Sequence, residues 1–262
     1  PLRFLQTPRA LKVLLPIIYH DLTHCIERAF QDAGHETHVV NWRRHQKNPS
    51  KVEQFVIQEA AKFKPDLAWC QFQAPGLITS RLPIFLKSIG CFSVNWAGDV
   101  RHPLPDWYAS TAPHFSVTSF SNMTDVETIR KAGHRSEFLQ VGYDPMLYNN
   151  EGTGERSGVV FLGNNYGGYK FAESDSRRNM AQALAEAFPD QFMAYGMSWE
   201  GVLPKQNCGG YIREPDDAKI LRDALVAVGW DHFHRPWLAS DRLLRATACG
   251  CATINQHYEG IE

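Results

Sequence analysis

Apolar and polar positions follow two periods along the chain, one typical of buried strands and one typical of helices. Residues 10–18 form an apolar run interrupted only by Lys12, as in a strand that is buried on both faces. Residues 22–33 then carry apolar side chains at helical spacing, and the pattern stops at Gly34. The alternation continues to the end of the chain, so the sequence predicts βα units that form parallel sheets with helices on both faces.

Further strands and helices are expected in both halves of the chain. In the first half the expected strands are 37–42, 67–72, 91–96, 115–120 and 137–142, and the expected helices include 52–63 and 122–132. In the second half the expected strands are 158–163, 191–196, 209–212, 224–229 and 251–255, and the expected helices are 176–188, 216–223 and 240–248.

Residues 144–158 interrupt the pattern with Asn, Gly, Ser and charged residues and are the best linker candidate. We therefore expect two Rossmann-like α/β domains, residues 1–148 and 149–262. The chain ends soon after its last expected strand, where an α/β domain normally adds a helix. The second domain is therefore expected to be incomplete at its C-terminus.

Composition narrows the class of protein. Of the 262 residues, 44% are hydrophobic and 21% are charged, which is typical of a globular protein. No apolar run approaches the roughly 20 residues that span a bilayer, and no signal peptide is evident, so we expect a cytoplasmic protein without a membrane span. The six cysteines show no C-x-x-C spacing and are expected to be free thiols, with Cys25, Cys70, Cys91 and Cys249 buried.

Charge is distributed unevenly between the two halves. Residues 1–150 carry 16 Lys/Arg against 13 Asp/Glu, and 8 of the 11 histidines fall there. A mildly basic first half is compatible with an anionic partner, and nucleic acid is one such partner. The excess of positive charge is nevertheless far below that of a dedicated nucleic-acid-binding domain.

Ligands of open parallel sheets bind beyond the carboxyl ends of the strands, so the residues that follow each strand are the site candidates. Gly163, Asn164, Asn165 and Tyr166 form a Gly-rich turn of this kind, whose backbone N–H groups could approach a phosphate or a sugar. The turn lacks the G-x-G-x-x-G and P-loop spacings, so it is not a simple dinucleotide or ATP fingerprint. A plain surface loop is the alternative.

A second candidate segment lies near the end of the chain. Ser240 and Asp241 begin an expected helix with Arg242 in its first turn, and a helix N-terminus with a bidentate Arg suits a diphosphate. An ordinary capped helix with a surface Arg is the alternative. The loop that follows the last strand, Tyr258, Glu259 and Gly260, lies where a ligand would lie.

The first half offers candidates for the acceptor side. Asp99 follows an apolar strand and could accept a proton from an acceptor hydroxyl, or it could merely pair with Arg101. His20, after the first strand, is the alternative base. Aromatic and basic residues complete the acceptor-side set: Trp42, Arg43, Arg44, Trp96 and Arg101. The basic segment 42–51, which includes Lys47 and Lys51, could grip an anionic acceptor, with a solvated loop as the alternative.

Several motifs occur in an order that carries a family resemblance. They are KPDLAWCQ at 64–71, VNWAGDVR at 94–101, FLG at 161–163, Arg177-Arg178, Tyr195-Gly196 and SDRLLRATACG at 240–250. In this order the chain resembles the glycosyltransferase group 1 superfamily, particularly its spore-maturation-type branch and related bacterial and phage enzymes. The resemblance implies a GT-B fold, in which two Rossmann-like domains with parallel sheets face a cleft. It also implies a nucleoside-diphosphate sugar bound mainly by the second domain, and no obligatory metal.

One position departs from the family pattern. Many group 1 enzymes have a Glu of a donor-binding pair where this chain has Arg245. The role of that Glu is therefore not transferred to this chain, and a retaining mechanism is less secure.

We expect a glycosyltransferase that moves a hexosyl or pentosyl group from a nucleotide sugar, a UDP-sugar first among them, to a hydroxyl acceptor. The acceptor could be a glycan, a protein, a metabolite or a hydroxylated DNA base. Residues Tyr195 and Gly196 are expected near the donor, and Tyr211, Ile212 and Arg213 beside its nucleobase. No cofactor and no metal site are expected, because the sequence holds no D-x-D motif and no carboxylate cluster of the kind that binds a metal. A sugar-nucleotide epimerase and a non-catalytic sugar- or nucleotide-binding module are the alternatives.

Overall fold

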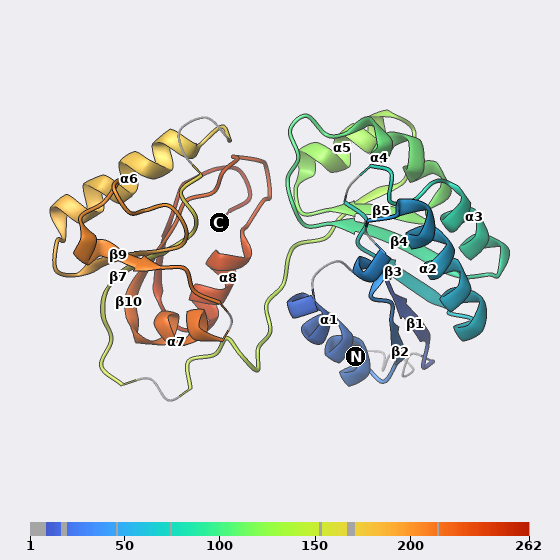
Figure 1. Ribbon diagram of the computed structural model, residues 1–262, viewed down its shortest axis with the longest axis horizontal. Helices are drawn as coiled ribbons and strands as arrows, with labels where there is room; N and C mark the ends of the chain where they lie inside the picture. The colour runs from blue at the N-terminus through green and yellow to red at the C-terminus, as the bar shows by residue number, and fades with distance from the viewer. Residues whose placement is uncertain are drawn as a thin grey trace, which may run out of the picture. The chain divides into compact units, whose positions relative to one another are not determined.

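The chain divides into two α/β units, Pro1–Leu139 and Gln140–Glu262, each built on its own parallel sheet (Figure 1). The computed structural model describes residues 9–16, 20–45, 47–73, 75–151, 154–166, 171–213 and 215–261. The prediction of an α/β fold with parallel sheets is confirmed.

The first unit holds a six-stranded sheet in the order β2-β1-β3-β4-β5-β6, in which all neighbours are parallel. Its strands are β1 Lys12–Leu15, β2 Glu36–Val39, β3 Leu67–Cys70, β4 Phe92–Ala97, β5 Val117–Phe120 and β6 Ser136–Phe138. Its helices are α1 His20–Asp32, α2 Pro49–Phe63, α3 Arg81–Ser88, α4 Asp106–Thr111 and α5 Met123–Lys131, with short 3-10 turns at Trp42–His45 and Ala112–His114. The strand order reverses between β1 and β3.

Alternate side chains of β1 explain why this strand is apolar after Lys12. Val13 and Leu15 pack on the face that α1 covers, whereas Leu14 packs on the opposite face, which α2 and α3 cover. All three side chains are fully buried. A strand between two helical layers has no solvent-facing side, so its sequence shows no polar alternation.

The second unit holds a five-stranded parallel sheet in the order β11-β10-β7-β8-β9. Its strands are β7 Ser157–Leu162, β8 Phe192–Tyr195, β9 Cys208–Gly210, β10 Ala224–Gly229 and β11 Ala252–Asn255. Its helices are α6 Ser174–Ala187, α7 Asp216–Asp223 and α8 Asp241–Ala248, with a 3-10 turn at Lys205–Asn207.

The central strands of the second unit are also buried on both sides. Val160 packs with α7 and α8, and Phe161 packs with α6 on the other face. At the carboxyl ends of β10 and β11, Gly229 lies opposite Asn255 in the ladder. A Cβ atom on Gly229 would lie 2.0 Å from the Asn255 side-chain oxygen, so any side chain at position 229 would displace that of Asn255.

Several element bounds differ from the sequence prediction. Strands β1 and β6 are shorter than the runs at 10–18 and 137–142, and the segment 42–51 holds a 3-10 turn and the start of α2 instead of a loop. The units divide at residues 139 and 140, ahead of the predicted linker, because Leu147 and Tyr148 pack in the core of the second unit.

The cysteines and the helices add two further observations. All six cysteines are free; Cys251 is buried with Cys70, Cys91 and Cys249, whereas Cys25 is only partly buried. Among the helices of the described ranges, the longest has 15 residues, and none has the length and apolar character needed to cross a bilayer.

Candidate functional site

The loops that follow β7 and β8 are joined by hydrogen bonds at the carboxyl edge of the second sheet. Gly196 adopts a φ of 143°, and a Cβ atom there would lie 2.3 Å from the carbonyl oxygen of Gly163. The Asn164 side chain accepts a hydrogen bond from the Met197 backbone N–H at 2.9 Å, and the Trp199 indole donates to the Gly163 carbonyl at 2.7 Å. These contacts fix the Gly-rich turn, so it is not a loose surface loop.

The side chains of the turn have structural partners. Asn165 is buried and donates to the Ser198 carbonyl at 2.8 Å. The Tyr166 ring is partly exposed and contacts the His232 ring, with 5.0 Å between centroids. Of the predicted donor residues here, the asparagines shape the loop, and Tyr166 presents part of its ring to solvent.

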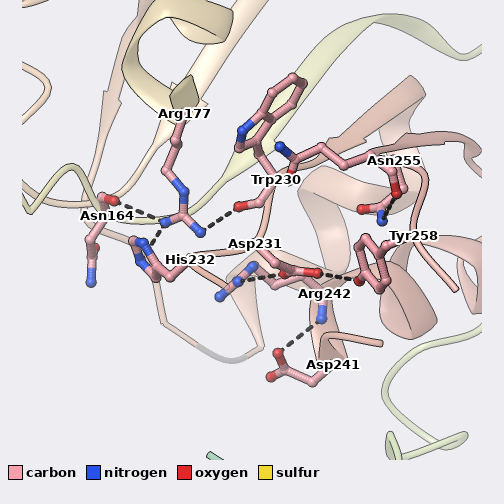
Figure 2. A network of polar contacts seen from close by, with 10 residues as sticks. Asn164, Arg177, Trp230, Asp231, His232, Asp241, Arg242, Asn255 and Tyr258 are labelled. Carbon is pink, nitrogen blue, oxygen red and sulfur yellow. Dashed lines mark hydrogen bonds and ion pairs between the residues drawn. The ribbon is translucent and has the colours of Figure 1, made fainter. Parts of the chain in front are cut away.

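Arg177, in the first turns of α6, is the central buried cation of this edge (Figure 2). Its side chain is 2% exposed and donates to the Asn164 carbonyl at 3.2 Å, to His232 Nε2 at 2.7 Å and to the Trp230 carbonyl. Arginine has no acceptor atom, so His232 must accept at Nε2 and carry its proton on Nδ1. Burial, assisted by the nearby Arg242, lowers the pKa of Arg177 to about 9.

Asp231 joins three segments at the same edge (Figure 2). Asp231 follows β10 and is 4% exposed. One of its carboxylate oxygens accepts a hydrogen bond from the Tyr258 hydroxyl at 2.8 Å. The other oxygen lies 3.5 Å from the guanidinium of Arg242, which stands in the first turn of α8. Burial and the neighbouring Asp231 raise the pKa of Tyr258, so this phenol keeps its proton and donates.

The start of α8 partly matches the prediction. Ser240 occupies the N-cap position in an extended conformation, but its hydroxyl makes no capping hydrogen bond. Asp241 instead accepts from the Arg242 backbone N–H at 3.0 Å. The structure therefore brings together Arg242, Tyr258 and the α8 N-terminus among the predicted residues, and it adds Arg177, Asp231 and His232.

The loop after β11 is held through backbone contacts. The carbonyl of Glu259 accepts from the Trp237 N–H at 2.8 Å, and Gly260 lies against the Trp237 ring. Trp237 has a positive φ of 66°, a conformation rare for a bulky residue, and its side chain is half exposed. The Glu259 side chain is exposed.

Four other predicted donor residues lie elsewhere. Tyr211, Ile212 and Arg213 follow β9, the outermost strand, two strands away from β7; Tyr211 is exposed, with the Arg213 guanidinium 5.7 Å from its ring. The Tyr195 ring covers Gly209, and a Cβ atom on Gly209 would lie 2.3 Å from this ring. Tyr195 therefore fills the space between β8 and β9.

Arg245, at the position of the family Glu, is engaged in the helical layer. Its guanidinium lies 3.2 Å from both Asp217 and Asp241 and 4.7 Å from the centre of the Tyr148 ring. The Tyr148 hydroxyl also donates to Asp217 at 2.8 Å. The residue therefore serves as an ionic link between α7, α8 and the segment before β7.

In the first unit, Asp99 and Arg101 follow β4 as predicted. They form an ion pair at 3.3 Å in which both side chains are a little less than half exposed, and Arg101 also lies 3.5 Å from the side-chain oxygen of Gln73. His20 begins α1, but its side chain lies outside the described residues.

The aromatic residues predicted on the acceptor side are core residues. Trp42 is 3% exposed and stacks on Phe72, and Trp96 is 6% exposed and stacks on Trp69. These positions correct the expectation of an aromatic acceptor surface, because neither indole face is open to a ligand. The side chains of Arg43 and Arg44 lie outside the described residues, and Lys47 and Lys51 are exposed.

Sequence reasoning missed Asp231 and His232 although the rule that found the other candidates applies to them. The run Trp230-Asp231-His232 directly follows the apolar strand 224–229. Arg177 does not follow a strand and appears only as part of the Arg177-Arg178 motif, because a helical arginine reads as a surface residue. Within the part of the chain that the structure describes, no three His, Cys, Asp or Glu side chains are grouped as metal ligands.

No known family model and no curated protein sequence matches the chain. Solved structures do match it. A glycosyltransferase from Rickettsia africae ESF-5 has a TM-score of 0.63 at 8% identity, over 96% of this chain and 80% of that one. The α,α-trehalose 6-phosphate synthase of Burkholderia multivorans has a TM-score of 0.61 at 10% identity, over 96% and 84%.

A third solved structure, a trehalose-6-phosphate protein from E. coli bound with UDP-2-fluoro glucose, has a TM-score of 0.60 at 8% identity, over 95% of this chain and 85% of that one. Identities this low establish the fold, and the spore-maturation-type branch stays a prediction. By its fold the chain is a GT-B protein that matches glycosyltransferase structures along almost its whole length.

Proposed function

We propose that this protein transfers a glycosyl group from a nucleoside-diphosphate sugar to a hydroxyl acceptor. The observation that carries the proposal is the charge at the carboxyl edge of the second sheet. Two guanidinium groups, Arg177 and Arg242, stand near a single buried carboxylate, Asp231, at the N-terminus of α8. The partly exposed Arg242 guanidinium beside a helix N-terminus is complementary to a diphosphate.

The chemistry follows from where charge develops. The acceptor oxygen forms a bond to the anomeric carbon of the sugar while the bond from that carbon to the phosphate oxygen breaks, and the nucleoside diphosphate leaves with the electron pair. Arg242 and the α8 N-terminus would stabilise the negative charge on the leaving group. One of the solved GT-B structures carries a UDP-sugar analogue, which supports testing uridine nucleotides first.

The acceptor proton needs a base. Asp99 is our candidate for an inverting reaction, because an exposed carboxylate at the end of β4 is accessible to an acceptor hydroxyl. His20 is the second candidate. The acceptor would be a hydroxyl-bearing glycan, protein, metabolite or modified DNA base.

The decisive experiment is calorimetry with UDP, GDP and their common sugar conjugates on the wild-type protein and on Arg242→Ala. A charge-assisted hydrogen bond is worth about 1.5–3 kcal/mol, so we expect Arg242→Ala to weaken UDP binding by roughly 10- to 150-fold. Lys219→Ala removes the same unit charge from the exposed side of α7 and should leave UDP affinity unchanged.

Two results would refute the proposal. One is the absence of binding by every nucleoside diphosphate and nucleotide sugar at millimolar concentration. The other is UDP binding that Arg242→Ala does not change. Binding without release of UDP in the presence of any acceptor class would instead favour a non-catalytic sugar-nucleotide-binding module.

A further inference from the structure

Asp231 is a buried carboxylate whose two oxygens are shared between two different segments. Its first oxygen lies 3.5 Å from the Arg242 guanidinium, and its second accepts from the Tyr258 hydroxyl at 2.8 Å. One side chain at the end of β10 thus holds the start of α8 and the loop after β11 (Figure 2).

The same combination of side chains occurs a second time in this unit, which allows a direct comparison. Asp217 accepts from the Tyr148 hydroxyl at 2.8 Å and lies 3.2 Å from the Arg245 guanidinium. There the arginine side chain is 13% exposed, so carboxylate and guanidinium are both enclosed in the helical layer.

The Asp231 arrangement differs in one respect. Its carboxylate is 5% exposed, but the Arg242 side chain is 35% exposed. The aspartate is enclosed, while about a third of its arginine side chain is open to solvent. An arginine held from one side and open on the other is oriented for a ligand, whereas an arginine enclosed on all sides serves packing alone.

We propose that Asp231 is a positioning residue that orients Arg242 and, through Tyr258, the loop after β11 for the diphosphate of the donor. The inference rests on the proposed function and deepens it. An arginine side chain that moves freely loses conformational entropy when it binds a ligand. The contact with Asp231 restricts Arg242 before the ligand binds, so the entropy cost of binding is smaller.

The direction in which Asp231→Asn changes UDP affinity distinguishes a positioning role from a purely electrostatic one. Asp231 carries a negative charge close to the proposed diphosphate, so removal of this charge alone should tighten the binding of an anion. Positioning predicts the opposite, because the released Arg242 would no longer point at the phosphates. The conservative variant Asp231→Asn keeps the shape of the side chain and separates the two effects.

The test is a double-mutant cycle in which UDP affinity is measured by calorimetry on wild type, Asp231→Asn, Arg242→Ala and the double variant. We expect Asp231→Asn to weaken UDP binding by about 5- to 20-fold in the wild-type background. In the Arg242→Ala background the same change should weaken binding by less than about twofold, or should tighten it.

Asp217→Asn is the matched control, because it breaks the corresponding enclosed arrangement. It should lower the melting temperature and leave UDP affinity unchanged. If Asp231→Asn does not fold, Tyr258→Phe replaces it, since this variant removes one donor to Asp231 and keeps the ring. We expect Tyr258→Phe to weaken UDP binding by about 2- to 5-fold, and this loss should also shrink in the Arg242→Ala background.

Three outcomes overturn the inference. In the first, folded Asp231→Asn binds UDP as well as or better than wild type. In the second, its loss of affinity is the same with and without Arg242. In the third, Asp217→Asn weakens UDP binding to the same extent. If wild-type protein binds no nucleoside diphosphate at all, the proposed function fails, and the inference fails with it.

Discussion

Replacement of Arg177 by methionine tests whether this buried cation holds the strand-end loops together. Methionine keeps an unbranched stem of similar length but has no donor. Arg177→Met therefore removes the hydrogen bonds to the Asn164 carbonyl, to the Trp230 carbonyl and to His232 Nε2, and also the guanidinium that lies 5.5 Å from the centre of the Phe161 ring.

The magnitude follows from the groups that are left behind. A buried acceptor that loses its partner costs about 1–3 kcal/mol, and three acceptors lose theirs here. Against this, the variant no longer has to bury a guanidinium, a cost seen in the lowering of the pKa of Arg177 to about 9. We expect a net loss of about 3 kcal/mol in the free energy of unfolding, a large share of the roughly 5–15 kcal/mol typical of a protein domain.

Thermal denaturation measures this loss. At about 4 °C per kcal/mol for a unit of this size, the melting temperature should fall by about 12 °C. Arg178→Met is the control, because the partly buried Arg178 pairs at 3.6 Å with Asp175, whose side chain is 62% exposed, and ion pairs with an exposed partner contribute at most about 1 kcal/mol. A melting temperature for Arg177→Met within about 3 °C of wild type would show that the freed acceptors find other donors, and that Arg177 does not fix the loops.

Two further predictions concern the sheet edges. Gly196→Ala should lower the stability of the second unit by at least about 2 kcal/mol, because its Cβ atom would lie 2.3 Å from the Gly163 carbonyl oxygen. Gly142→Ala, where the added carbon meets no atom within 4 Å, is the control, and equal melting temperatures for the two variants would contradict the argument. Asp99→Asn should reduce glycosyl transfer by about 10²- to 10⁴-fold with UDP affinity and melting temperature unchanged. A lower melting temperature with a rate that follows the folded fraction would instead assign Asp99 a structural role with Arg101.

The sequence predicted the order of elements well, because strands buried on two faces and helices between them have distinct periods. The strand 224–229 and the helix 216–223 are found with their predicted bounds. Bounds failed where tertiary contacts decide them. Tyr148 reads as part of a polar linker, yet its hydroxyl is bonded to Asp217, 69 residues away in the chain.

The candidate site was predictable only in part, for a similar reason. Position after a strand pointed to Tyr258, and position in the first turn of a helix pointed to Arg242. Neither pattern showed which residues hold these two side chains. Trp42 and Trp96 stand beside basic or polar residues in the sequence, and only the fold reveals that both rings face the core. The partners of a buried polar group come from distant segments, so local pattern does not identify them.

The contact between Gly229 and Asn255 has a consequence for how this protein can diverge. The two residues belong to adjacent parallel strands, and the Asn255 side chain occupies the space that a side chain at position 229 would need. A larger residue at position 229 therefore requires that the Asn255 side chain turns away or that position 255 becomes smaller. Substitutions at the two positions are therefore expected to be coupled in their effect on stability.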